Sequence, residues 1–142
     1  MIVVDVNLLI YAVDQGAPQH RAAHRWWQSA LTGQEAVGLP WSTMLAFVRL
    51  TTNPRVFTHP LDADEAFDLL EGWTARPHVV HVEPTPRHLA VVRGLLVGAG
   101  TAGNLVSDAH LAAIAIENGA TLCSADADFT RFPGLKWTNP LA

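Results

Sequence analysis

The sequence has only one cysteine and one lysine, and it contains no long apolar run. Cys123 is the sole cysteine, so no internal disulfide can form and a reducing compartment is expected. No apolar run approaches the roughly 18 residues that span a bilayer. The first residues also lack the basic-then-apolar pattern of a leader. We therefore expect a cytoplasmic protein without a membrane segment.

Charged residues are scarce at 15%, whereas hydrophobic residues make up 49% of the 142 positions. This composition excludes a disordered chain and is typical of one folded domain with a sizeable core. The formal net charge of −4 argues against a generic nucleic-acid-binding protein, because such proteins are usually basic. If nucleic acid is nevertheless the ligand, a divalent cation has to reverse the local charge where acids gather.

Short apolar runs alternate with amphipathic stretches along the chain. The apolar runs predict strands over residues 1–4, 36–40, 79–82 and 120–124, with an edge strand at 136–138. The amphipathic stretches predict helices over residues 8–13, 19–31, 41–52, 62–73, 85–96 and 107–117, with a flexible loop over 98–104. Strands that alternate with helices favour an α/β sandwich around a parallel sheet.

Four aspartates are predicted to gather at one edge of this sheet. Asp5 follows the first strand, and Asp126 and Asp128 follow the fourth. Asp108 lies in the first turn of the helix that precedes the fourth strand. The carboxyl ends of parallel strands form the edge where open α/β sheets bind ligands. Carboxylates held this close raise one another's pKa values unless a cation is present.

An oxygen-only cluster, without cysteine or histidine at ligand spacing, suits a hard divalent ion such as Mg²⁺ or Mn²⁺. Such an ion activates water for attack on a phosphodiester and stabilises the leaving oxygen. Three of the acids also have an ordinary interpretation, since Asp108 complements the dipole of its helix and residues 126–128 form a solvated turn. Asp5 is harder to explain in this way, because apolar residues flank it on both sides. The clustering of all four favours a metal site.

Three segments, taken in order, resemble the PIN-domain ribonucleases: residues 3–9 (VVDVNLL), 106–113 (VSDAHLAA) and 122–129 (LCSADADF). The chain is more closely similar to the VapC toxins of bacterial toxin–antitoxin pairs, and residues 47–57 (FVRLTTNPRVF) add to that likeness. No single motif is specific, but the ordered set covers the whole chain. The resemblance implies a PIN-like three-layer α/β/α fold with a central parallel sheet of four to five strands, in a single domain over residues 1–142.

The same resemblance implies a function. It indicates a Mg²⁺- or Mn²⁺-dependent endoribonuclease that cuts structured RNA, is silenced by a VapB-type antitoxin and is usually a homodimer. By motif, Asp5, Asp108 and Asp126 are catalytic acids that bind the metal. Asp128 is a further catalytic acid, either an auxiliary ligand or a group that orders water. Asn7 is a supporting polar residue beside Asp5, where substrate binds.

The chain departs from the family in one respect. PIN-domain nucleases commonly carry a glutamate in the helix after the second strand, but residues 41–52 contain no acid. Ala46 or Phe47 stands near the expected position, and Glu35 lies too early in the chain to be a convincing replacement. Either the aspartates suffice, or the affinity for metal is lower than in the rest of the family.

Other polar residues have more than one interpretation. Arg49 either contacts RNA phosphate as a substrate-binding residue or forms a structural ion pair near the acids. His110, two positions beyond Asp108, is expected to point away from it around the helix. His20 and His24 have the spacing of metal ligands, but without a third ligand nearby they are more typical of a hydrophilic helix face.

Two other classes of function compete with a nuclease. The run Asp5-Val6-Asn7 also resembles the start of haloacid-dehalogenase-type phosphatases. That family requires a second aspartate where Asn7 stands and a lysine before the last acidic motif, whereas Lys136 follows that motif. The other alternative is a catalytically weakened PIN fold that only binds RNA or a partner. The missing glutamate permits that alternative and the four aspartates oppose it, so the nuclease is the hypothesis that we carry forward.

Overall fold

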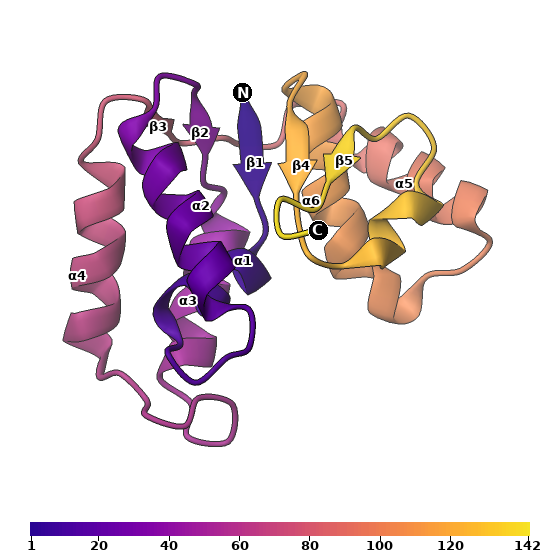
Figure 1. Ribbon diagram of the computed structural model, residues 1–142. Coiled ribbons are helices and arrows are strands. Elements are labelled where there is room, and N and C mark those ends of the chain that lie inside the picture. Colours follow the sequence, from indigo (N-terminus) through magenta and orange to yellow (C-terminus); the bar gives the residue numbers. More distant parts are fainter.

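The computed structural model describes residues 1 to 142 as three layers, with a sheet between two groups of helices (Figure 1). The five strands are β1 (Ile2–Val4), β2 (Val37–Gly38), β3 (Val79–Val80), β4 (Thr121–Cys123) and β5 (Trp137–Thr138). Every neighbouring pair is parallel, in the order β3-β2-β1-β4-β5. The predicted fold class and the edge position of the last strand are confirmed. Because β1 and β4 are neighbours, the two strands that precede aspartates end side by side.

Four helices cover one face of the sheet. They are α1 (Val6–Val13), α2 (His20–Thr32), α3 (Trp41–Thr51) and α4 (Ala63–Thr74). Their apolar side chains pack on Val4 and Cys123 around the fully buried Trp27 and Phe47. The ring of Trp73 meets both of these aromatic rings edge-on. This packing fixes α3 beside the end of β1.

Two helices, α5 (His88–Ala99) and α6 (Val106–Glu117), cover the other face. Side chains alternate along a strand, so Val3 and Leu122 face this layer while Val4 and Cys123 face the first. Buried residues occur on nearly every side of α6, because α6 packs against both the sheet and α5. The first turn of α6 is therefore held firmly against the end of the sheet. No helix in either layer combines the length and the apolar character needed to cross a membrane.

The predicted helices are all found, including the capping box ahead of α4, but α5 is displaced. A helix was predicted over residues 85–96 with a flexible loop over 98–104. The helix instead begins at His88 and continues to Ala99, and a short 3₁₀ helix, η1 (Gly103–Leu105), follows it. Glycine weakens a helix without breaking it, so the loop prediction was wrong at its start. The helix ends where Gly100 adopts a left-handed conformation, with φ at 73°.

Candidate active site

Asp5 lies where β1 ends and α1 begins, and both of its carboxylate oxygens accept hydrogen bonds. Oδ1 accepts from the backbone N–H of Val6 (2.7 Å), which makes Asp5 the N-cap of α1. Oδ2 accepts from the hydroxyl of Ser124 (2.7 Å). A charged group at the end of a buried strand needs such partners. The pairing of β1 with β4 supplies one of them, because Ser124 directly follows β4.

The hydroxyl of Ser124 is the centre of a network that joins the ends of β1 and β4. Its Oγ accepts hydrogen bonds from the side-chain amide of Asn7 (3.2 Å) and from the backbone N–H of Asp126 (3.0 Å). Ser124 is fully buried. The sequence analysis missed it, because a serine after a strand carries no distinctive signal. Asn7 supports the network around Asp5, and its contact with substrate stays a prediction.

Removing the Ser124 hydroxyl is expected to destabilise the protein by about 1–3 kcal/mol, because buried polar groups lose their partner. RNA cleavage is expected to fall as well, since the ends of β1 and β4 lose their connection. Thermal unfolding of Ser124→Ala beside the wild type measures the first effect. Ser29→Ala is the matched control, since Ser29 is exposed on α2. Equal melting temperatures for Ser124→Ala and the wild type would contradict this role.

Three further aspartates converge beside Asp5. Asp108, Asp126 and Asp128 each offer a carboxylate oxygen, and these atoms all lie within 4.8 Å of one another. Asp108 comes from the first turn of α6, and the other two come from the segment after β4, where Asp126 caps the 3₁₀ helix η2 (Ala127–Arg131). The N–H of Asp128 donates to Oδ1 of Asp126 (2.9 Å). Asp5 is outside the 4.8 Å group, although the charge of Asp126 acts on it.

The pKa values of these acids reflect their burial and mutual repulsion. Burial raises the pKa of Asp5, although the hydrogen bonds from Ser124 and the backbone oppose the shift. For Asp108, burial is again the largest cause, and the charges of Asp126, Asp5 and Asp128 add to it and raise the pKa to about 6. No basic side chain forms a salt bridge with any of the four. A divalent cation is the counter-charge that fits such a set.

The raised pKa of Asp108 predicts that the metal-free protein loses stability as the pH rises from 3.8 to about 6. In this window the folded state holds a proton that the unfolded state has released, so the free energy of unfolding falls with pH. Asp108→Asn removes this contribution. We therefore expect the melting temperature of the wild type in EDTA to fall relative to that of Asp108→Asn across the window. Circular dichroism measures the two melting temperatures as a function of pH. If they change by the same amount across the window, the raised pKa of Asp108 is contradicted.

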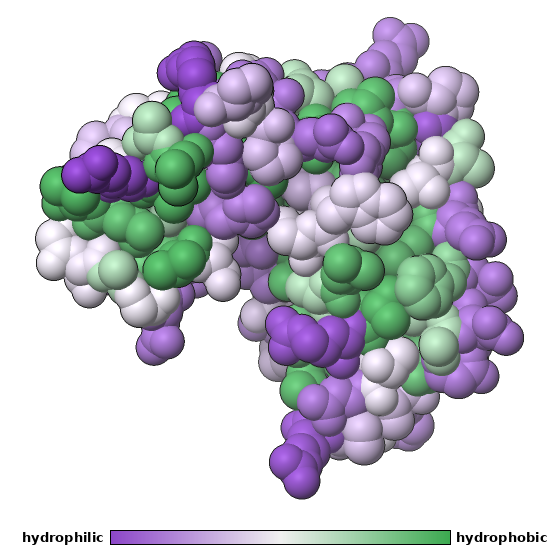
Figure 2. All heavy atoms as spheres, turned by 180° about the vertical axis from the view of Figure 1, so that it is seen from behind, coloured by the Kyte–Doolittle hydropathy of each residue, from purple (hydrophilic) through white to green (hydrophobic).

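Two of the four aspartates border a cleft between α3 and the layer formed by α5 and α6. Figure 2 shows this cleft as a hollow between two lobes of the molecule. Asp5 and Asp108 contribute carboxylates to its lining, and hydroxyl groups come from α3 and α6. Leu89 and Val106 also line it, with exposed fractions of 84% and 46%. The cleft therefore combines an acidic side with exposed apolar side chains.

Helix α3 presents no acid to this cleft. Ala46 lines the cleft, whereas Phe47 is fully buried in the core and does not line it. Of the two positions that could correspond to the family glutamate, Ala46 is therefore the one beside the acids. Arg49 also lines the cleft and has no carboxylate within salt-bridge distance. The ion-pair interpretation of Arg49 is wrong, and its guanidinium group is free to bind another anion.

Two histidines on the cleft wall were not predicted as part of the site. His110 was expected to point away from Asp108, yet both residues line the cleft. The Nδ1 atom of His110 lies 2.8 Å from Nε2 of His88, and Nδ1 of His88 is hydrogen bonded to Glu117. No sequence motif signals this arrangement, because it depends on how α5 packs against α6.

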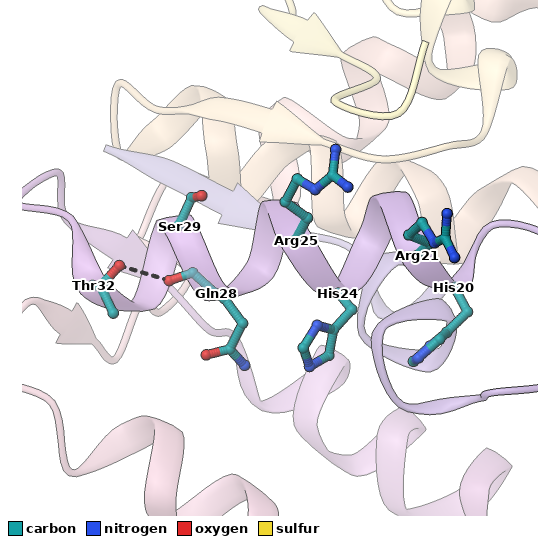
Figure 3. Close-up of a pocket in the computed structure, with 7 residues that line it drawn as sticks. All are labelled: His20, Arg21, His24, Arg25, Gln28, Ser29 and Thr32. Atoms are coloured by element: carbon teal, nitrogen blue, oxygen red, sulfur yellow. Dashed lines mark hydrogen bonds between the residues drawn. The ribbon is translucent and has the colours of Figure 1, made fainter.

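The other histidine pair, His20 and His24, lies on an open face of α2. Figure 3 shows the residues that line this face: His20, Arg21, His24, Arg25, Gln28, Ser29 and Thr32. None of them is an acid or a cysteine, and Nδ1 of His20 is hydrogen bonded to the carbonyl of Tyr11 (2.9 Å). All the residues on this face are polar or charged, in agreement with the hydrophilic helix face that was expected.

Comparison with known proteins connects this geometry to a family. Residues 2–135 match the PIN domain family. Ribonuclease VapC33 of Mycobacterium tuberculosis is 45% identical over 141 residues, with 99% of each chain covered. The structure of VapBC-1 from nontypeable Haemophilus influenzae is similar with a TM-score of 0.69, at 19% identity and with 100% of both chains covered. The structure of M. tuberculosis VapC20, a sarcin-ricin loop cleaving toxin, has a TM-score of 0.68 at 17% identity, with 96% of this chain and 99% of that chain covered. The chain therefore belongs to the PIN domain family, and within it to the VapC ribonucleases.

Proposed function

We propose that this protein is the endoribonuclease toxin of a VapBC-type toxin–antitoxin pair, and that it hydrolyses phosphodiester bonds in RNA with the help of Mg²⁺ or Mn²⁺. The observation that carries the proposal is the group of Asp108, Asp126 and Asp128, whose carboxylates converge within 4.8 Å of one another. The kinship with ribonuclease VapC33 supports the reaction. The proposal treats residues 1–142 as a single PIN domain.

The set of donor atoms fits a hard divalent ion. All the donors are carboxylate oxygens, which is the preference of Mg²⁺ and Mn²⁺. We assign Asp5, Asp108 and Asp126 as the metal-binding acids and Asp128 as an auxiliary catalytic acid. A bound ion of this kind lowers the pKa of water and stabilises charge on the leaving oxygen. The ion would also favour the ionised form of Asp108, whose pKa is about 6 without it.

Other groups in the cleft have the chemistry to hold the substrate. The guanidinium of Arg49 matches two phosphate oxygens, and no acid in the protein competes for it. Leu89 and Val106 offer exposed apolar contacts to a ribose or a base. Ser124 and Asn7 keep the end of β1 joined to the end of β4, so that Asp5 stays oriented. The cleft thus offers separate groups for the phosphate and for its flanking nucleosides.

A catalytically weakened protein that only binds RNA or a partner is the second candidate. The absence of an acid on α3, where Ala46 lines the cleft, favours it. The four aspartates argue against it. Mutually repelling carboxylates destabilise the metal-free fold, and a protein that only binds RNA does not require them. The nuclease is therefore the better supported of the two.

We propose a VapB-type antitoxin as the partner and a homodimer as the assembly, with structured RNA as the substrate. A solved structure with the same fold is named VapBC-1, and VapC20, which also has this fold, is named as a toxin. Large hydrophobic side chains are exposed on α3, α4 and β3, among them Trp41, Phe67 and Val80, which border one apolar pocket. Exposed apolar surface of this kind supports a contact with another protein chain. A cytoplasmic location stays a prediction.

Cleavage of total bacterial RNA tests the proposed function. Purified protein, free of antitoxin, is incubated with the RNA in Mg²⁺, in Mn²⁺ and in EDTA, beside Asp5→Asn. We expect discrete fragments that require a metal ion and that are missing with the variant. If folded protein cleaves nothing with either ion but still binds RNA, the binding-only candidate replaces the nuclease. Unchanged cleavage by Asp5→Asn would remove Asp5 from the catalytic acids.

A further inference from the structure

Two exposed arginines lie on one face of α2, outside the cleft. Arg21 and Arg25 are one helical turn apart, so they are neighbours on the helix surface. Figure 3 shows Arg25 and Ser29 on one side of the helix, whereas His24 and Gln28 point to the other side. No other helix carries two arginine or lysine residues one turn apart. We call Arg21 and Arg25 the arginine pair.

The arginine pair is unfavourable for the stability of α2. Like charges at positions i and i+4 repel each other, and Arg21 lies in the first turn, where the helix dipole disfavours a cation. The first turn of α2 contains no acid, and no side chain caps the helix. No carboxylate lies within salt-bridge distance of either arginine. Helix stability therefore does not account for the pair, whereas binding of a polyanion would.

The arginine pair lies toward the end of the molecule that contains the acids. The chain leaves the carboxyl end of β1 in α1 and returns in α2 to the start of β2, which is parallel to β1. The N-terminal half of α2, with both arginines, therefore lies toward the carboxyl ends of the strands (Figure 1). Asp5 marks this end, because it joins β1 to α1. An RNA strand that leaves the cleft across this end of the sheet can continue to the arginine pair.

The cleft alone offers little positive charge to a nucleic acid. Arg49 is the only arginine or lysine that lines it, and the protein has a formal net charge of −4. Affinity for RNA depends on cations that displace the counterions of backbone phosphates, and a guanidinium group matches two phosphate oxygens. We propose that Arg21 and Arg25 bind backbone phosphates of the substrate RNA outside the cleft. This inference rests on the proposed function, because it requires RNA in the cleft.

Fluorescence anisotropy tests the inference without any cleavage. The probe is a labelled random-sequence single-stranded RNA, in Ca²⁺ instead of Mg²⁺. We expect about threefold weaker binding for Arg21→Ala and for Arg25→Ala, and about tenfold for the double variant, as for exposed ion pairs. The slope of log affinity against log salt concentration should become shallower by about 0.7 for each arginine removed. Replacement of both arginines by lysine keeps the charges and should keep most of the affinity.

Lys136→Ala is the matched control for the loss of one positive charge. Lys136 is exposed and precedes β5, so it lies at the opposite end of the parallel sheet. Its loss should weaken binding less than the loss of either arginine. Equal effects of Lys136→Ala and Arg21→Ala, or RNA binding by the double alanine variant that equals that of the wild type, would overturn the inference and leave an acidic protein segment as the ligand of the pair. The proposed function fails separately, when the wild type cleaves no RNA in Mg²⁺ or Mn²⁺.

Discussion

Asparagine in place of Asp108 is expected to reduce RNA cleavage at least about a hundredfold, because losing a carboxylate from a metal centre weakens both ion binding and the orientation of water. Asp108 is the member of the cluster whose pKa is raised to about 6. The substitution should therefore also raise the melting temperature of the protein in EDTA, since it removes a repelled charge. Rates on a labelled RNA that contains a mapped cleavage site, together with thermal unfolding, measure the two effects.

The test is specific because the two effects have opposite directions: cleavage falls while metal-free stability rises. A destabilised variant would lose activity and melting temperature together, whereas this account predicts that activity falls while metal-free stability rises. Asp68→Asn is the matched control, because Asp68 is an exposed aspartate on α4 and should change neither quantity. Full cleavage by Asp108→Asn would show that the reaction does not use this cluster.

A glutamate in place of Ala46 is expected to raise the affinity for Mn²⁺ about tenfold, because an added carboxylate increases the number of charged oxygen ligands. Ala46 lines the cleft beside Asp5 and Asp108 on the helix that otherwise has no acid. Cleavage at limiting metal concentration should rise in parallel, and the metal-free protein should be less stable. Cleavage rates measured across a Mn²⁺ titration report the change.

Leu45→Glu is the control for this gain. Leu45 is on the same helix and is 54% exposed, but it does not line the cleft. It adds the same charge and should leave the metal dependence unchanged. If both variants shift the titration equally, the effect is one of overall charge. If neither does, Ala46 is not the position where the family glutamate would act.

The parts of the site that could be predicted from sequence are those that depend on strand ends. Asp5, Asp126 and Asp128 each follow an apolar strand, and parallel strands end at one edge, so their convergence follows from topology. Asp108 was predicted because a first-turn acid before β4 faces the same edge. The topology did not predict the distances between the acids. Asp108, Asp126 and Asp128 form the closest group, whereas Asp5 is hydrogen bonded to Ser124.

The parts that could not be predicted depend on packing between helices. His88 and His110 meet only because α5 packs against α6, and the prediction placed the start of α5 too early in the chain. Helical spacing alone suggested that His110 would point away from Asp108, but both residues line the cleft. Ser124 was missed for a related reason, since its role comes from its hydrogen bonds to Asp5 and Asn7, which follow the end of β1.

A calorimetric titration of the RNA-free protein with Mn²⁺ tests the central claim most directly. The claim is that the aspartates at the ends of β1 and β4 and in the first turn of α6 hold a divalent cation. The account predicts saturable binding by the wild type that is lost in Asp126→Asn and kept in Asp68→Asn. Binding that is absent from the folded wild type, or that persists unchanged in Asp126→Asn, would contradict it.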